Sequence, residues 1–190
     1  IDPDRKRAVV QPGAVWSALN ERAKPYGLVF GPDPSTGNRC TLGGMIANNA
    51  AGAHSLLYGM TDRWVRGLKL MLDSGDMIAL KPYRLDTPEF EARLAGAGRE
   101  AGIYRALIPL LRARAREIES TWPNAPRNRH GYLLKGVLHN GTIDLCRLLC
   151  ASEGTLGVVI EADLELAEIP PFSGLLSLSF ADRIQAAAAT

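Results

Sequence analysis

The chain has 190 residues, enough for one ordinary domain with its own hydrophobic core. Hydrophobic residues make up 46% and charged residues 22%, and the formal net charge is only +2, so neither nucleic-acid binding nor membrane-surface binding has electrostatic support. The three cysteines have no regular spacing, which argues against a disulfide framework, and no apolar run is long enough to span a bilayer. We therefore expect a cytoplasmic protein without a transmembrane segment, which reaches a membrane, if at all, through a partner.

The first part of the chain predicts short elements separated by turns. Residues 8–10 are typical of a strand, and residues 14–27 have apolar side chains at helical spacing until Pro25 and Gly27 stop the pattern. Residues 28–30 predict a short buried strand that leads into a turn-rich loop over residues 31–40.

The middle and the end of the chain mix strands and helices without strict alternation. Two apolar runs joined by Asp73–Asp76 predict a hairpin over residues 66–80, and residues 88–120 are mostly helical. A short amphipathic helix is predicted to end at Gly154, before an alternating strand over residues 158–169. Asn140-Gly141 between apolar runs predicts a tight turn. This mixture favours an α+β domain over a doubly wound parallel sheet.

Both ends of the sequence suggest cuts through a larger protein. The chain opens without an initiator Met, and Pro170-Pro171 separates residues 171–190 as a linker would. Beyond this linker, Leu175–Phe180 predict a strand, and Asp182–Ala189 predict the first turns of a helix that has no C-cap.

Residues 31–52 form the strongest candidate for a ligand site. Gly43-Gly44 open a predicted helix, where free N–H groups favour an anion such as a diphosphate. Hydroxyl groups precede this point, and small residues and the amides of Asn48 and Asn49 follow it. The same small residues also suit a tight helix–sheet contact without a ligand, and the two interpretations are equally supported by composition.

A second candidate covers residues 151–166, where Gly157 permits a close backbone approach before a β-branched strand. From the residues alone, a plain helix–turn–strand junction is the favoured explanation of this segment. Residues 96–101 match the dinucleotide pattern G-x-G-x-x-A, but a helical rather than a strand-like segment precedes them, so we reject that interpretation.

Metal and nucleophile chemistry have little support. His54, His130 and His139 lack metal-ligand spacing, although the first two lie beside the candidate loops. Cys146 and Cys150 are best explained as small buried residues. We predict no metal site.

Six segments, taken in chain order, resemble one family. They are GPDPST, TLGGMIANNAAG, YG, an L-K-L-x-L-x-x-G-D hairpin, GY and SEGTLGVV. It is the flavoprotein superfamily of vanillyl-alcohol oxidase and p-cresol methylhydroxylase (PCMH). Within it, the sequence is similar to the branch that holds the D component of glycolate oxidase, D-lactate dehydrogenase and D-2-hydroxyglutarate dehydrogenase.

The resemblance implies the second subdomain of the PCMH-type FAD-binding fold, with a mixed or antiparallel sheet flanked by helices. Residues 1–170 would form this FAD-binding domain without its N-terminal subdomain, and residues 171–190 would begin the substrate domain. The cofactor would be FAD, and residues 34–52, Tyr132 and residues 153–160 would lie along it. The individual positions that the resemblance assigns to the cofactor are Pro34, Ser35, Thr36, Gly37, Cys40, Thr41, Gly43, Gly44, Asn48, Asn49, Ala50, Ala51, Gly52, Tyr132, Glu153, Gly154, Thr155, Gly157, Val158, Val159 and Ile160.

In function, the resemblance implies a flavin-dependent enzyme that oxidises a small D-2-hydroxy acid by hydride transfer to FAD. Some relatives carry a fused iron–sulfur half, so an iron–sulfur electron-transfer partner or fused domain is implied as well. The family's R-G-G-G-T-S-like loop and its catalytic His residues have no counterpart here, so we assign no catalytic residue and expect the chain alone to bind FAD weakly or not at all. The alternative is a degenerate, non-catalytic module that acts as a structural or electron-transfer partner.

Overall fold

The computed structural model describes residues 1–123, 125, 127 and 131–189. At its centre is an antiparallel sheet with the strand order β1–β8–β3–β4. The strands are β1 (Arg7–Val10), β8 (Val158–Glu165), β3 (Val65–Met71) and β4 (Met77–Leu80). β3 and β4 form the predicted hairpin, and the mixture of antiparallel sheets with helices confirms the α+β class.

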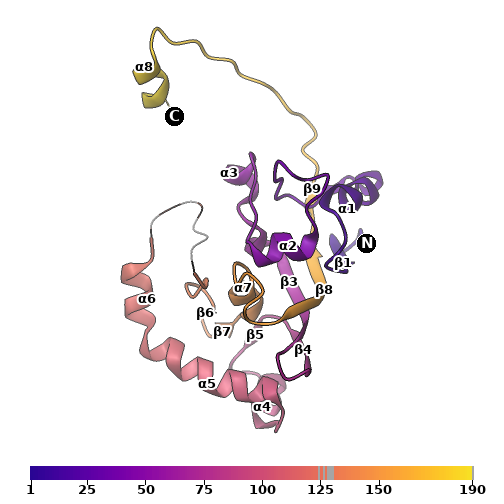
Figure 1. The fold of residues 1–190 in the computed structure, drawn as a ribbon, viewed down its shortest axis with the longest axis vertical. Coiled ribbons are helices and arrows are strands. Elements are labelled where there is room, and N and C mark those ends of the chain that lie inside the picture. The colour runs from indigo at the N-terminus through magenta and orange to yellow at the C-terminus, as the bar shows by residue number, and fades with distance from the viewer. Residues whose placement is uncertain (124, 126, 128–130, 190) are drawn as a thin grey trace.

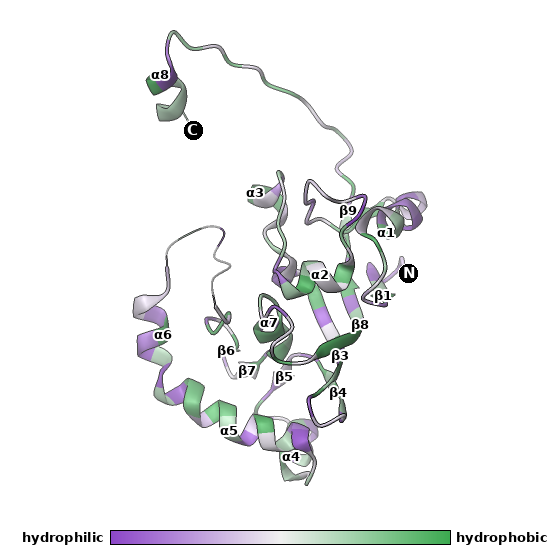
Figure 2. Cartoon of the chain, in the orientation of Figure 1, coloured by the Kyte–Doolittle hydropathy of each residue, from purple (hydrophilic) through white to green (hydrophobic). Residues whose placement is uncertain are grey.

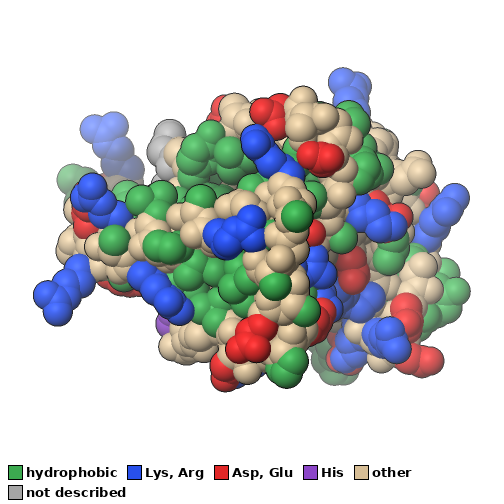
Figure 3. Space-filling model, turned by 90° about the horizontal axis from the view of Figure 1, so that it is seen from below, with side chains coloured by type: hydrophobic (Ala, Val, Ile, Leu, Met, Phe, Trp, Pro, Cys, Tyr) green, Lys and Arg blue, Asp and Glu red, His purple; other side chains and the backbone are tan. Residues whose placement is uncertain are grey.

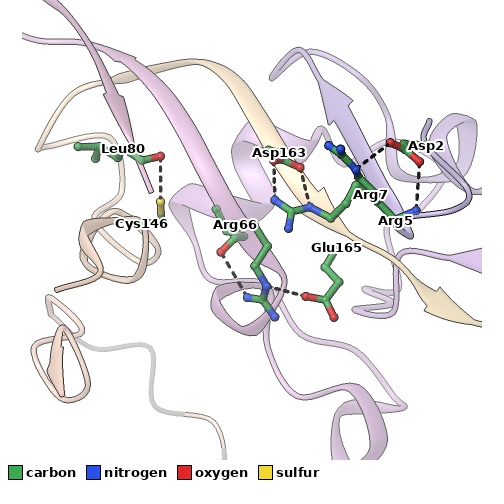
Figure 4. A network of polar contacts seen from close by, with 9 residues as sticks. Asp2, Arg5, Arg7, Arg66, Leu80, Cys146, Asp163 and Glu165 are labelled. Carbon is green, nitrogen blue, oxygen red and sulfur yellow. Dashed lines mark hydrogen bonds and ion pairs between the residues drawn. The ribbon is translucent and has the colours of Figure 1, made fainter. Parts of the chain in front are cut away.

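The two faces of this sheet differ in chemistry. Ala162 and Leu164 of β8 are buried on the core side. On the other face, Arg7 pairs with Asp163 and Arg66 pairs with Glu165, as Figure 4 shows. Because oppositely charged side chains lie next to each other on neighbouring strands, this face can remain in water without a covering layer.

Helices cover the core side of the sheet. Helices α2 (Leu42–Ala47) and α7 (Leu145–Leu149) bury apolar side chains in the same core as β3 and β8. Figure 2 shows α7 as mainly hydrophobic, which fits a helix that lies within this core. Helix α1 (Trp16–Ala23) and the 3₁₀ turn η1 (Lys24–Tyr26) lead into β2 (Leu28–Val29), which pairs with β9 (Ala167–Glu168).

The predicted helical region 88–120 consists of three helices along one side of the molecule (Figure 1). They are α4 (Pro88–Ala95), α5 (Arg99–Ala113) and α6 (Ala115–Thr121). Buried Phe90 and Tyr104 pack their rings edge to face and hold α4 against α5, with 5.2 Å between ring centroids. Figure 3 shows this underside of the molecule, where hydrophobic side chains lie among Arg and Lys side chains.

The small sheet β5–β7–β6 confirms the predicted turn. Strand β7 (Thr142–Ile143) pairs with β5 (Tyr83–Arg84) and with β6 (Leu138–His139). Between β6 and β7, Asn140 and Gly141 have φ angles of 48° and 72°, which is the left-handed pair that a two-residue hairpin turn requires.

Two sequence predictions in the second half are wrong. The helix expected to reach Gly154 ends at Leu149, since Ala151, Glu153 and Gly154 all have left-handed φ angles that a helix cannot contain. The strand expected over Leu175–Phe180 does not form, because this segment has no strand partner in the described structure and extends into solvent before α8 (Arg183–Ala188) (Figure 1). An alternating pattern stabilises a strand only where a neighbouring strand satisfies its backbone groups.

No helix in the described part of the chain is both long enough and apolar enough to cross a bilayer.

Candidate functional site

The start of α2 is bonded to the protein's own chain. Gly43 N–H donates to Pro12 O over 2.9 Å, and Leu42 N–H donates to Ala14 O over 2.8 Å. Gly44 N–H donates to the hydroxyl of the N-cap residue Thr41 over 3.3 Å. The expectation of free amide groups at this helix start is therefore wrong, because residues 12–14 run beside it and take up its donors.

The glycines around α2 make close contacts within the protein. A Cβ on Gly43 would lie 2.6 Å from Pro12 Cβ, and one on Gly37 would lie 2.6 Å from the Trp16 ring. At Gly52 the added atom would lie only 1.8 Å from Asp33 O. Tight packing thus explains these small residues, which was one of the two interpretations open from composition.

Asn48 and Asn49 have different surroundings. Asn49 is 1% exposed, and its carboxamide oxygen accepts the N–H of Asp62 over 2.8 Å. It thereby caps the short 3₁₀ turn η2 (Thr61–Arg63). Asn48 ends α2 with an exposed side chain, so it is the amide of this pair that can reach a ligand.

The two candidate segments meet at the end of α2. Ala151 N–H donates to Ile46 O over 3.1 Å, and Glu153 N–H donates to Ala47 O over 3.0 Å. The segments are therefore neighbours, as expected, but they meet through the last turn of α2 and not through Gly43.

An open cleft lies on the outer side of the second segment. Its volume is about 940 Å³, and its lining comes from residues 154–158, from residues 71–73 at the end of β3 and from parts of residues 97–106 at the start of α5. A Cβ added to Gly154, Gly98 or Gly102 would meet no atom within 4 Å, so these glycines present bare backbone to open space. The described residues that line this cleft do not include Gly43.

Tyr132 and Thr155 meet at this second segment. The Tyr132 hydroxyl lies 2.9 Å from Thr155 Oγ1, and Thr155 Oγ1 also donates to Ser152 O over 2.5 Å. Two residues that the sequence places along the cofactor from distant positions are thus brought together, and both are exposed.

The predicted cofactor positions fall into three groups by exposure, and their role remains a prediction. The exposed positions are Ser35, Thr36, Gly44, Asn48, Tyr132, Glu153, Gly154, Thr155, Val158 and Ile160. The half-buried positions are Pro34, Cys40, Thr41, Gly43, Ala50, Gly157 and Val159. The buried positions are Gly37, Asn49, Ala51 and Gly52.

The cysteines at positions 146 and 150 lie in the core. Cys146 and Cys150 are both 0% exposed, and burial raises the pKa of each thiol well above its ordinary value. Both thiols therefore stay protonated and unreactive at neutral pH. Within the described ranges, no group of His, Cys, Asp and Glu side chains could hold a metal ion, and His130 lies outside these ranges.

Two features escaped the sequence prediction. Asp33 lies 2.5 Å from the His54 ring, measured from Oδ2 to Nδ1, although neither residue was assigned to the site. Residues 96–101 do follow a helix, α4, which supports rejecting the dinucleotide motif, but Gly98 of this stretch lines the cleft beside Gly154. Neither contact has a local sequence signal, because each joins segments far apart in the chain.

Comparison with known proteins finds a domain family and longer proteins to which the chain is similar. Residues 1–81 match the model of the FAD binding domain. A D-2-hydroxyglutarate dehydrogenase of Pseudomonas putida is 36% identical over 181 residues, which cover 95% of this chain and 18% of that protein. The glycolate oxidase subunit GlcD of Bacillus subtilis is 30% identical over 190 residues, which cover 100% of this chain and 29% of that protein.

A solved alkyldihydroxyacetonephosphate synthase shares the fold, with a TM-score of 0.52 and 17% identity over 90% of this chain and 21% of that one. The chain spans less than a third of the length of these relatives. The match of residues 1–81 to the FAD binding domain indicates FAD as the cofactor.

Proposed function

We propose that this chain forms one side of the FAD site of a flavin-dependent oxidoreductase that oxidises a D-2-hydroxy acid of the lactate, glycolate or 2-hydroxyglutarate class. The observation that carries the proposal is the cleft lined by residues 154–158. The residues just before this stretch, Ala151 and Glu153, are hydrogen-bonded to the end of α2. The names of the relatives, D-2-hydroxyglutarate dehydrogenase and glycolate oxidase subunit GlcD, support the substrate class.

The cleft has room and chemistry for part of a dinucleotide. Its volume of about 940 Å³ lies within the range of small-molecule sites, and its glycines allow a flat group to approach the backbone closely. Thr155 lines the cleft, and its hydroxyl contacts that of Tyr132. Ser35 and Asn48 offer exposed polar groups on the loops around α2, outside the lining of the cleft.

The start of α2 does not fit a diphosphate, because its amide groups are already bonded to Pro12 and Ala14. The anionic part of the cofactor must therefore be met by other donors. When bound, FAD supplies the hydride acceptor, and the residues of this chain place it and exclude water from it.

FAD binding can be tested by filling the cleft. We expect Thr155→Trp to weaken FAD binding at least tenfold in the gene product that carries this sequence, since the indole would occupy the space beside Gly154. Thr121→Trp, on the exposed end of α6, is the matched control and should bind like the wild type. Quenching of flavin fluorescence gives the dissociation constants.

Equal affinity of the Thr155→Trp and wild-type proteins would contradict the assignment of the cleft. The substrate class is tested on the same gene product with D-lactate, glycolate and D-2-hydroxyglutarate, each with a dye as electron acceptor. If none of them reduces the dye while FAD is bound, the degenerate-module alternative gains support.

A further inference from the structure

Asp33 makes two hydrogen bonds to one residue on a different loop. Its Oδ1 accepts the backbone N–H of His54 over 3.1 Å, and its Oδ2 lies 2.5 Å from His54 Nδ1. The side chain of Asp33 is 21% exposed and that of His54 is 69% exposed, so the carboxylate lies beneath the imidazole. This geometry places the proton of the neutral ring on Nδ1 and leaves Nε2 free of this contact.

The backbones of the two loops touch at the same place. Gly52 lies against Asp33 so closely that a Cβ would come within 1.8 Å of Asp33 O. Two residues earlier, a Cβ on Gly31 would come within 2.5 Å of the Tyr58 ring. Residues 31–33 therefore run along the inner side of residues 52–58, and the Asp33–His54 pair closes this contact on the solvent side.

The base of the second loop is fixed separately. Thr61 donates to Ala50 O through both its N–H, over 3.0 Å, and its hydroxyl, over 2.8 Å. The buried carboxamide of Asn49 holds Asp62 beside it. The two ends of the loop over residues 50–60 are thus held together by hydrogen bonds between residues 49–50 and 61–62. Asp33 connects this loop to the loop over residues 31–37.

We propose that Asp33 and His54 form a clamp that holds loop 33–37 and loop 50–55 in the arrangement that receives FAD, with both residues acting as positioning residues. The inference rests on the proposed function, because both loops lie within residues 1–81, which match the FAD binding domain, and outside the lining of the cleft. Neither residue is in the predicted cofactor set, yet the pair ties the two predicted loop segments together by hydrogen bonds.

The side chains around His54 come from three parts of the chain. Asp33 faces its Nδ1, and the Tyr58 ring of α3 (Ser55–Tyr58) lies edge-on at 6.4 Å between centroids. Arg127 donates to Ser55 Oγ over 2.9 Å and to Gly52 O over 3.1 Å. The carboxylate of Asp33 thus contacts the imidazole directly, and the guanidinium of Arg127 binds residues on either side of His54.

The test uses two substitutions of His54, each of which keeps a polar group at the place of only one of the two ring nitrogens. In His54→Asn, the side-chain amide nitrogen takes the place of Nδ1 and can still donate to Asp33. In His54→Gln, the amide lies one bond further out, near the place of Nε2, so the side-chain donor to Asp33 is lost while the backbone N–H of residue 54 remains. Asp33→Ala removes the acceptor, and Asp86→Ala removes an exposed carboxylate that pairs locally with Arg84.

Hydrogen exchange on the present chain measures the clamp itself. We expect the amides of residues 52–58 to exchange about tenfold faster in His54→Gln, which corresponds to the loss of one charge-assisted hydrogen bond. Exchange should be at least as fast in Asp33→Ala, which loses both bonds to His54. His54→Asn and Asp86→Ala should exchange like the wild type. Unchanged exchange in Asp33→Ala would overturn the clamp.

FAD affinity in the gene product measures the effect of the clamp on cofactor binding. We expect the dissociation constant to rise about tenfold in Asp33→Ala and His54→Gln, and to stay within about twofold in His54→Asn. If His54→Asn binds FAD as poorly as His54→Gln, the ring and not the tie to Asp33 is needed, and the inference is wrong. Unchanged affinity in every variant also overturns it and leaves the FAD proposal intact, whereas a wild-type protein that binds no FAD overturns the proposed function itself.

Discussion

The segments around α2 and around Gly154 are both rich in small residues, but they use them in opposite ways. At Gly43 and Gly52 the missing side chain makes room for the protein's own backbone. At Gly154 and Gly102 it leaves open space above the chain. A run of small residues therefore indicates a close approach, and only the fold shows whether a protein segment or a ligand makes that approach.

The largest expected difference lies between two Gly→Ala substitutions. Gly52→Ala should destabilise the protein by about 3 kcal/mol, because the new methyl group overlaps the backbone of Asp33. Gly102→Ala, inside α5 and facing the cleft, should stabilise it by about 0.5–1 kcal/mol, because alanine has the higher helix propensity and meets no atom. Urea unfolding measures both, and similar values for the two variants would remove the contrast between the regions.

Asn49 and Asn48 sharpen the comparison within one region. Asn49→Ala should lower the free energy of unfolding by about 2 kcal/mol, because the buried N–H of Asp62 loses its acceptor. Asn48→Ala, with an exposed side chain, should change it by less than about 0.5 kcal/mol. Thermal unfolding of the two variants side by side decides the matter, and a stable Asn49→Ala protein would show that this amide is not structural.

The smallest effect concerns Asp144, the N-cap of α7, the helix that leads into the second region. Burial raises the pKa of this carboxyl above its ordinary value of 3.8. The folded state therefore binds a proton at Asp144 more tightly than the unfolded state does. As a result, the free energy of unfolding of the wild type falls as the pH rises through the raised pKa. Asp144→Asn keeps a good N-cap and removes this dependence, so its stability relative to the wild type should increase from about pH 4 to about pH 7.

Urea unfolding at both pH values tests this sign. A difference between the two proteins that stays constant or falls with pH would show that the hydrogen bonds of the ionised carboxylate outweigh its burial.

Elements with local chemistry could be predicted from the sequence. The turn at Asn140-Gly141 and the β3–β4 hairpin follow from residues that lie next to each other in the chain. The α+β class follows from the order of such elements. In the candidate site, the neighbourhood of the two segments was also predictable, because each segment carries a recognisable motif.

What could not be predicted depends on contacts between distant segments. Nothing in residues 41–44 reveals that Pro12 and Ala14 will take up the amides at the start of α2. In the same way, Leu175–Phe180 have the pattern of a strand but no partner in the described structure. The Asp33–His54 contact joins two loops whose sequences give no sign of each other.

The position of β8 between β1 and β3 has a consequence for synthesis on the ribosome. Both neighbours leave the ribosome long before β8 does, so neither can form its ladder with β8 until the chain has grown to residue 165. At about 5–20 residues per second, β3 waits on the order of ten seconds with one edge unpaired. During that interval the nascent chain is most exposed to misassociation, and a chaperone that shields strand edges would have its greatest effect there.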